Sequence, residues 1–359
     1  MLRQLNLCFK KQSMKKRNSS VNKTIHNFYL SKLKNPKIKK LYSRFKRIIS
    51  KDTDKNYCIA ISGGPDSMAL AFLTKCMSIE RGTSNVYFHI DHKLRKESKK
   101  EALFIKKILK KFDVNLNILK WVKNNNLNNI QEQARLKRYE LLFKKCKKHK
   151  LNKILTAHHK DDLYENFFIR LLRGSGLNGL ISFKKKYSKL KINEKILIFR
   201  PLLNFSKNEL IYISENTFGN YIKDPSNLDN KYLRVYVRNI LNNFKFNKKN
   251  KNFDTSLSNL HKSNKALEHY IKKNIDLNVI KNKEKVIVSK NFFSEPDEVV
   301  FRSLNIVLNS FSDKAKLSRG SKIMNLIKNF KNSKDTYKTT LSGCIFKKVS
   351  NTMIISREI

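Results

Sequence analysis

The amino-acid sequence predicts an α/β protein: a domain built on a parallel sheet, then a helical linker and a small α+β domain. Short apolar segments alternate with helical segments up to about residue 245, and a glycine turn joins the first of these strands to a helix. From about Phe246 lysine and asparagine dominate and the alternation stops. Strand–helix alternation is typical of parallel sheets. The expected divisions are 1–50, 51–245, 246–282 and 283–359.

The turn after the first strand is the most informative stretch. Residues 57–61 are apolar, as in a buried parallel strand, and residues 68–72 are apolar on nearly every face, as in a buried helix. Between them, Gly63 and Gly64 permit backbone angles that a Cβ would forbid, and Pro65 suits the first helical position. Because a helix N-terminus presents free N–H groups and a positive dipole end, the turn predicts a phosphate or pyrophosphate site.

Three polar side chains complete this loop. Ser62 and Ser67 offer hydroxyl donors. Asp66 would repel a phosphate, so we expect it to bind magnesium or to orient the loop. The alternative is a structural strand-to-helix turn with a helix-capping carboxylate.

The rest of this domain repeats the pattern. The carboxyl ends of parallel strands meet at one edge of a sheet, where ligands bind. A second strand, residues 85–90, ends at Asp91 and His92, which we therefore place beside the glycine turn. The further expected elements are helices at 97–112, 131–149, 164–173 and 206–214, and strands at 115–121, 153–157 and 195–199.

A second polar stretch follows the strand at 153–157. If a helix begins near Lys160, then His158, Asp162 and Glu165 lie about one turn apart and project to one side. Such a cluster can hold magnesium or bind an amine. The alternative is an acidic first turn that complements the helix dipole.

Basic residues follow in two places. Arg173 opens a glycine-rich loop, and Arg234 and Arg238 lie four residues apart on an expected helix that trails a turn at 224–227. Arg135 lies on the helix at 131–149. A solvated basic face is the structural alternative for Arg234 and Arg238.

Composition narrows the class of protein. The formal net charge is +50, which favours a polyanionic partner, although the heavy use of Lys, Asn and Ile also fits an AT-rich genome. There is no uncharged apolar run long enough for a transmembrane helix. The five cysteines are widely spaced and predict neither disulfides nor zinc, so a cytoplasmic protein is expected. Residues 1–50 lack Asp and Glu, and we expect a basic leader followed by a helix that packs on the domain. An organellar transit peptide is the alternative there, and Met14 is a candidate start.

The second part of the chain reads as a separate basic unit without catalytic residues. We expect helices at 257–275, 296–310 and 318–330, and a hairpin-like pair at 338–347 and 352–356.

Taken together, the motifs resemble the PP-loop ATP pyrophosphatases, and within them the bacterial tRNA(Ile)-lysidine synthetases. The resemblance rests on Ser62-Gly-Gly-Pro-Asp-Ser67, Asp91-His92-x-Leu-Arg95, Gln133-Ala-Arg135, Thr156-Ala-His-His-x-Asp-Asp162 with Glu165, Arg173-Gly-Ser-Gly-Leu-x-Gly-Leu180, Arg200-Pro-Leu-Leu203 and Asp224-Pro-Ser-Asn227. Asn166 departs from the family, which usually has Thr there.

The resemblance implies a PP-loop (adenine nucleotide alpha hydrolase-like) fold and an ATP-dependent ligation of L-lysine to the wobble cytidine of tRNA(Ile) with a CAU anticodon. No stable protein partner is expected. It implies ATP contacts from 62–67, Asp91 and His92, and magnesium on Asp66 and Asp162. It also implies catalytic roles for Asp66, Asp162, Glu165, His158 and Arg135, and tRNA phosphate contacts from Arg173, Arg234 and Arg238.

Two competing interpretations stay open. A tRNA thiolase of the 2-thiocytidine type would use the same adenylation, but it needs paired cysteines or an iron–sulfur site. A non-catalytic RNA-binding protein with a relict fold would not need the intact loop and the Asp162/Glu165 cluster.

Overall fold

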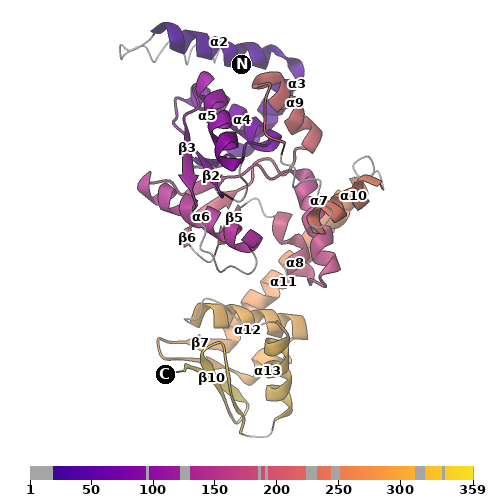
Figure 1. Ribbon diagram of the computed structural model, residues 1–359. Coiled ribbons are helices and arrows are strands. Elements are labelled where there is room, and N and C mark those ends of the chain that lie inside the picture. Colours follow the sequence, from indigo (N-terminus) through magenta and orange to yellow (C-terminus); the bar gives the residue numbers. More distant parts are fainter. Residues whose placement is uncertain are drawn as a thin grey trace. The chain divides into compact units, whose positions relative to one another are not determined.

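The first part of the chain forms a six-stranded sheet with strand order β3-β2-β1-β4-β6-β5 (Figure 1). The strands are β1 (Cys58–Ala60), β2 (Val86–Asp91), β3 (Leu116–Lys120), β4 (Lys153–Leu155), β5 (Tyr187–Leu190) and β6 (Asn193–Phe199). Strands β3, β2, β1, β4 and β6 are parallel, with Cys58 paired to Val86 on one side and to Ile154 on the other. The edge strand β5 runs antiparallel to β6. The predicted parallel sheet is therefore confirmed, and the antiparallel edge strand β5 is an addition that we did not expect.

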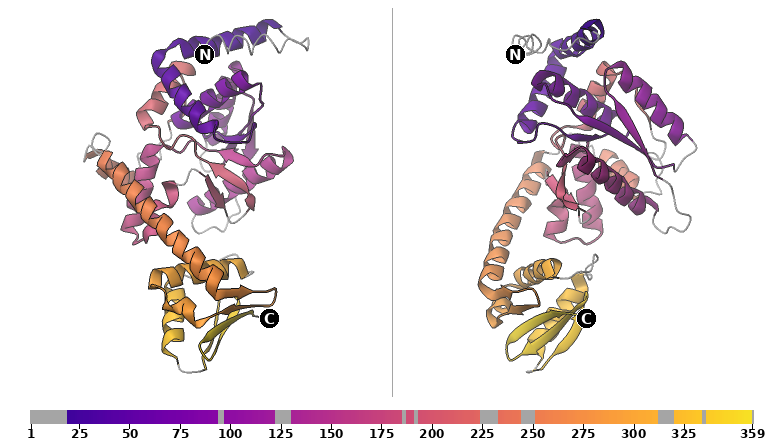
Figure 2. Two further views of the ribbon diagram at one scale, coloured as in Figure 1. Left: turned by 180° about the vertical axis from the view of Figure 1, so that it is seen from behind. Right: turned by 90° about the vertical axis from the view of Figure 1, so that its left-hand side faces the viewer.

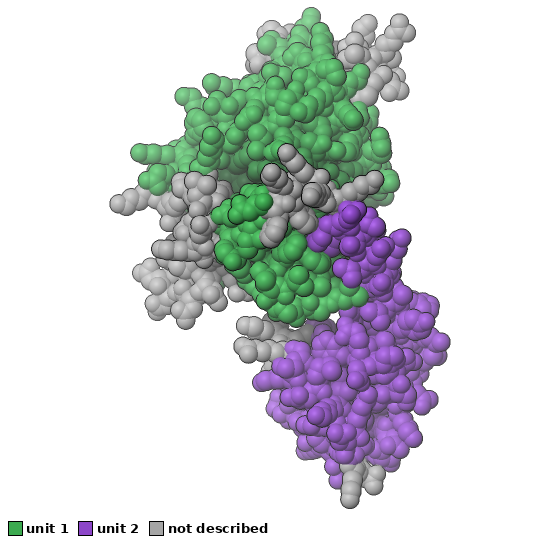
Figure 3. All heavy atoms as spheres, turned by 90° about the vertical axis from the view of Figure 1, so that its right-hand side faces the viewer, with its two compact units in different colours: residues 1–249 green, residues 250–359 purple. Residues whose placement is uncertain are grey.

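This computed structural model describes residues 19–93, 97–121, 130–184, 187–190, 193–223, 233–243, 251–311, 320–333 and 336–358. It divides into two compact units, residues 1–249 and 250–359 (Figure 3). Within the described ranges, none of the helices combines the length and the apolar character needed to cross a membrane. The predicted turn at 224–227 lies outside the described residues.

Helices cover both faces of the sheet (Figure 2). Those of the first unit are α2 (Ser19–Lys34), α3 (Pro36–Ile49), α4 (Pro65–Arg81), α5 (Ser98–Lys111), α6 (Ile130–Lys148), α7 (Lys160–Leu172), α8 (Leu177–Ile181), η1 (Ser182–Lys184), α9 (Lys207–Thr217) and α10 (Leu233–Asn243). Ile59 joins the core formed with α3, α4, α5 and α9, whereas its neighbour Cys58 packs with Leu142 of α6 on the other face. Burial on both faces explains why the first strand is a continuous apolar run.

The helical segment expected before the first strand is two helices. Asn35 separates α2 from α3, and its side chain accepts hydrogen bonds from the backbone N–H groups of Lys37 and Ile38 at 3.0 and 3.2 Å. Pro36 cannot continue a helix from the preceding residue but suits the first position of the next one. Tyr42 and Phe45 of α3 are fully buried, so α3 packs on the domain core.

The second unit has its own sheet and core. Helix α11 (Lys251–Asn278) leads into an antiparallel sheet of strand order β7-β8-β11-β10-β9. Its other elements are β7 (Val279–Lys281), β8 (Lys285–Val288), η4 (Lys290–Ser294), α12 (Asp297–Phe311), α13 (Gly320–Asn332), β9 (Lys338–Leu341), β10 (Cys344–Val349) and β11 (Thr352–Arg357). Residues 246–282 were set apart as a linker, but α11 is grouped with this unit.

The expected hairpin is confirmed where β10 pairs with β11, but its first arm, at 338–347, is two strands instead of one. Ser342 and Gly343 both have positive φ angles, 56° and 75°, and turn the chain between β9 and β10. The sequence pattern did not show where the strand ends, because β9 is polar and half-exposed and lacks a clear apolar alternation.

Candidate active site

The glycine turn lies where β1 ends and α4 begins. Gly63 has a φ of +93°, which only glycine adopts readily, and a Cβ there would lie 2.7 Å from Cδ1 of Ile222. Pro65 is the first residue of α4 and Gly64 its N-cap, as predicted. The hydroxyl of Ser67 accepts a hydrogen bond from the Gly63 N–H at 3.0 Å and donates one to the Gly64 carbonyl at 2.9 Å. These contacts fix the loop around the free N–H groups of the helix start.

The beginning of α7 is tied to the beginning of α9. The Lys160 N–H donates to the carbonyl of Phe205 at 2.9 Å, and the Lys207 N–H donates to Oδ2 of Asp161 at 3.2 Å. His159 is the N-cap residue just before α7, and its N–H donates to Oδ2 of Asp162 in the first turn at 3.0 Å. The acidic first turn is thus partly a helix-capping feature, as the structural alternative held, but its side chains also face the glycine turn.

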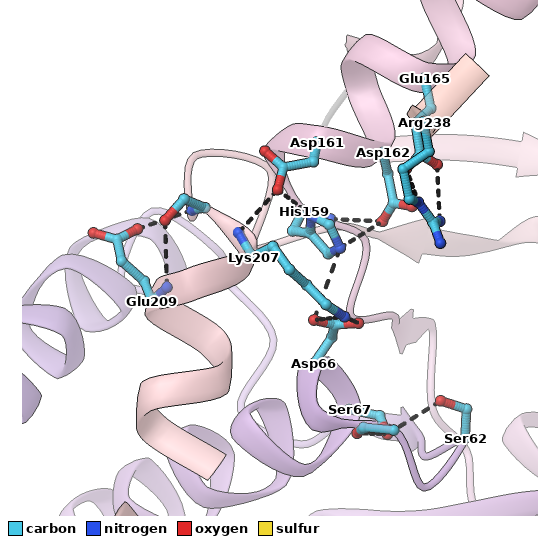
Figure 4. A network of polar contacts seen from close by, with 12 residues as sticks. Ser62, Asp66, Ser67, His159, Asp161, Asp162, Glu165, Lys207, Glu209 and Arg238 are labelled. Carbon is cyan, nitrogen blue, oxygen red and sulfur yellow. Dashed lines mark hydrogen bonds and ion pairs between the residues drawn. The ribbon is translucent and has the colours of Figure 1, made fainter. Parts of the chain in front are cut away.

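A chain of close polar contacts connects that turn to α7 (Figure 4). Lys207 Nζ contacts both oxygens of Asp66, at 2.7 and 2.8 Å. Nε2 of His159 lies 3.8 Å from Oδ1 of Asp66 and 3.5 Å from Oδ2 of Asp162. The carboxylates of Asp66 and Asp162 therefore converge on one imidazole, although they come from helices far apart in the sequence.

Glu165 is buried one turn further along α7. Its side chain is 3% exposed, and its two oxygens accept hydrogen bonds from Nε of Arg234 at 2.8 Å and Nε of Arg238 at 2.6 Å. This contact raises the pKa of Arg238. Arg234 also lies 3.5 Å from Asp162. The two arginines therefore hold α10 against the acidic face of α7.

The protonation state of Asp162 is set by competing effects. Burial alone would raise its pKa, but electrostatic interactions with His159, His158 and Arg234 and the bond from the His159 N–H lower the pKa to about 2. Asp162 is consequently ionised at neutral pH and is a weak base.

His158 follows β4 and points into different surroundings from His159. Its Nδ1 lies 2.8 Å from the hydroxyl of Thr156, and its ring packs edge-on against Phe183 at 5.3 Å. Burial, reinforced by Arg200 and Arg135, lowers the pKa of His158 to about 3 against the opposing field of Asp162. The imidazole is therefore neutral at physiological pH.

The end of β2 lies at the same edge of the sheet. Nδ1 of His89 is 2.9 Å from the carbonyl of Ile61, directly before the glycine turn. Asp91 is buried and accepts a hydrogen bond from the Lys93 N–H at 3.0 Å. Nε2 of His92 lies 3.1 Å from Nη2 and 3.2 Å from Nε of Arg138. Burial is the main cause that lowers the pKa of His92 to about 4, and the positive charge of Arg138 is the second.

Comparison with known proteins identifies the family of the chain. A profile described as a PP-loop domain matches residues 37–244. The tRNA(Ile)-lysidine synthase of Orientia tsutsugamushi is 35% identical over 312 residues, covering 84% of this chain and 69% of that protein. The enzyme of the same name from Wolbachia pipientis is 35% identical over 306 residues, covering 84% and 70%. The chain belongs to the tRNA(Ile)-lysidine synthase family. This confirms the family that the sequence motifs resemble.

Among solved structures, the U34-tRNA thiolase NcsA from Methanococcus maripaludis shares the fold. The TM-score is 0.54 at 15% sequence identity, covering 63% of this chain and 78% of that one. At such low identity the match supports the PP-loop fold that tRNA(Ile)-lysidine synthases share, and no more.

The structure places most of the predicted site residues in one region. Residues 62–67, Asp91 and His92 lie at the carboxyl ends of β1 and β2, and His158, Asp162 and Glu165 lie at or just beyond the end of β4. Arg135 is exposed on α6, with its guanidinium 5.4 Å from the ring of Tyr139. Arg173 ends α7 at an exposed position, followed by Gly174 with a φ of +66°.

The sequence analysis did not assign a role to three residues that take part in the site, Lys207, His159 and Arg200. Lys207 and His159 surround Asp66, and the charge of Arg200 acts on His158. His159 and Arg200 stood inside quoted motifs, and both follow strands at the ligand-binding edge, which was the available signal. For Lys207 the signal was its place directly after the Ser206 cap of α9.

Proposed function

We propose that this protein ligates L-lysine to C2 of the wobble cytidine of tRNA(Ile) with a CAU anticodon, forming lysidine and changing the codon read from AUG to AUA. ATP is cleaved to AMP and pyrophosphate. The observation that carries the proposal is the convergence of Asp66, His159 and Asp162 beside the glycine turn in a chain of the tRNA(Ile)-lysidine synthase family.

In the first step the cytosine C2 oxygen attacks the α-phosphate of ATP, and pyrophosphate leaves. Residues 62–67 bind the departing pyrophosphate through the N–H groups at the start of α4 and the serine hydroxyls. Asp91 and His92, at the end of the neighbouring strand, line the nucleotide site. Transfer of this kind depends on positioning and on charge neutralisation more than on covalent help.

The acidic residues fit a magnesium ion that is held together with nucleotide phosphates. Magnesium is usually bound by one or two carboxylates plus phosphates, and Asp66 and Asp162 converge on His159. Among the described residues, no three His, Cys, Asp or Glu side chains are grouped to hold a metal alone, in agreement with a site that phosphates complete. When bound, magnesium would neutralise charge on the phosphates.

In the second step the ε-amine of free L-lysine attacks C2, and AMP leaves. Asp162 attracts the ammonium group, whereas Glu165, buried and paired with Arg234 and Arg238, supports the site by holding α10 against α7. With a pKa near 2, Asp162 orients the amine better than it deprotonates it. His158, held neutral, and Arg135, whose charge acts on it, line the nucleotide.

The tRNA must reach this edge of the sheet with its wobble base out of the stack. Arg173 is exposed and suits a phosphate contact. Arg234 and Arg238 are 41% and 35% exposed, so N–H groups not used by Glu165 can take a weaker part. We propose the cytoplasm as the location and no stable protein partner.

The thiolase alternative finds little support in the cysteines. Cys58, Cys76, Cys146 and Cys344 are buried, and a hydrogen bond to Cys146 together with burial raises the pKa of the Cys58 thiol. Buried thiols of raised pKa are poor nucleophiles. Cys8 lies outside the described residues.

The proposal is tested by measuring AMP and pyrophosphate formation from ATP with the purified protein. We expect formation to require both the CAU-anticodon tRNA(Ile) and magnesium, and Asp66→Asn to slow it at saturating magnesium. Full pyrophosphate release by Asp66→Asn would remove Asp66 from the site. ATP cleavage without any tRNA requirement would refute the proposed substrate.

A further inference from the structure

The ion pair between Lys207 and Asp66 occupies the centre of the proposed pyrophosphate and magnesium site. Nζ of Lys207 contacts both oxygens of Asp66, at 2.7 and 2.8 Å, and the two side chains are 37% and 23% exposed. A carboxylate that serves a metal–nucleotide complex is here neutralised by a cation of the chain itself. The metal ion of that complex and the ammonium group of Lys207 thus compete for the carboxylate of Asp66.

The backbone at Lys207 is fixed, so only its side chain is free to relocate. The Lys207 N–H is bonded to Asp161, and Ser206 and Glu209 form a reciprocal cap in which the Ser206 N–H donates to Glu209 at 2.9 Å. Glu209 is held in turn by Arg44 at 2.6 Å. A lysine on such an anchored helix start moves its ammonium group through a flexible four-carbon stem.

The charges around Asp66 make this lysine important for anion binding. Asp66, Asp161 and Asp162 bring three carboxyl groups to the face that must accept a pyrophosphate. Burial raises the pKa of the Asp161 carboxyl. Lys207 is the basic side chain that the structure places directly on the loop carboxylate.

We propose that Lys207 is a switching cation. In the nucleotide-free protein it holds Asp66. When magnesium and ATP bind, Asp66 turns to the metal and the Lys207 ammonium moves to the β- and γ-phosphates, where it neutralises the departing pyrophosphate. The inference rests on the proposed function in that it takes 62–67 to be the pyrophosphate loop.

The proposal predicts opposite changes in two affinities. Removing the charge in Lys207→Gln frees Asp66 and makes the cluster more negative, so Mn²⁺ without nucleotide should bind several-fold more tightly, on the scale of one lost charge a few Å away. Pyrophosphate should bind about tenfold to a hundredfold more weakly, as expected for one lost charge-assisted hydrogen bond. A lysine that only neutralised Asp66 would raise the Mn²⁺ affinity when removed but would leave the pyrophosphate affinity unchanged.

The experiment uses the full chain. Two measurements are made on the wild type, Lys207→Gln and Lys207→Arg. Electron paramagnetic resonance of free Mn²⁺ gives the Mn²⁺ affinity, and calorimetry at a fixed magnesium concentration gives the affinity for inorganic pyrophosphate. Lys75→Gln is the matched control, since Lys75 also lies 2.7 Å from an aspartate, Asp113. We expect Lys207→Arg to keep most of the pyrophosphate affinity and Lys75→Gln to behave as wild type.

The outcomes separate this inference from the proposed function. Unchanged pyrophosphate binding in Lys207→Gln would overturn the switching cation and leave the proposed function standing. Weaker binding of both ligands would also overturn it, because it would show a collapse of the cluster. If wild-type protein binds no pyrophosphate in magnesium, the proposed function and the inference fall together.

Discussion

Glu165 offers a direct test of how the acidic face is built. Its carboxylate is buried and receives Arg234 and Arg238 from α10, so Glu165→Gln removes one charge at nearly constant volume. Breaking a fully buried pair costs about 3–5 kcal/mol. Because the arginine side chains are 41% and 35% exposed, water compensates part of that loss, and we expect about 2 kcal/mol of destabilisation.

A loss of this size is measurable in a unit of this length. At about 2–4 °C per kcal/mol, the melting temperature should fall by about 4–8 °C. Glu140→Gln is the matched control, because Glu140 pairs with Lys137 and Lys144 at the surface, 2.7 and 3.4 Å away. Its removal should change stability by less than about 0.5 kcal/mol.

Urea unfolding of Glu165→Gln, Arg238→Gln and the double variant completes the test. The two changes should be non-additive by about 1–2 kcal/mol, because each removes the same contact. If the free energies add within about 0.5 kcal/mol, the pair does not hold α10 on α7, and the reasoning fails.

Three other predictions concern the loop, its surroundings and the surface. Gly63→Ala should destabilise the protein by about 1–3 kcal/mol and weaken ATP binding, seen by thermal unfolding and calorimetry, because φ is +93°; wild-type values would contradict this. The folded-state pKa of His158, about 3, lies below the ordinary 6.5, so stability should fall as pH drops through that interval, and His158→Gln should flatten the dependence. Arg173→Gln should lower tRNA affinity and reduce the salt slope by about 1 while leaving melting unchanged, and an unaltered slope would remove Arg173 from the interface.

Local signals sufficed for the loop and for most elements of the first unit. The apolar strand, two glycines and a proline at the first helical position specify the strand–loop–helix without distant contacts, and the structure forms it as expected. The start of α9, with Ser206 as its N-cap, likewise agrees with the helix predicted over 206–214.

Contacts between segments that are distant in the chain could not be predicted from the sequence. Lys207 and Asp66 are 141 residues apart, and Arg238 and Glu165 are 73 apart, so their meeting depends on how whole helices pack. A lysine or arginine in a chain of net charge +50 carries little information by itself. In the second unit, short strands such as β7, with two of its three residues exposed, lack the alternation that marks a strand.

The central claim is tested most directly by transfer of radiolabelled L-lysine into a transcript of CAU-anticodon tRNA(Ile), with ATP and magnesium, beside a methionine tRNA with the same anticodon. The account predicts incorporation into the isoleucine tRNA alone. If no lysine is incorporated while ATP is still cleaved to AMP and pyrophosphate, lysine is not the substrate, and the thiolase interpretation becomes the better one.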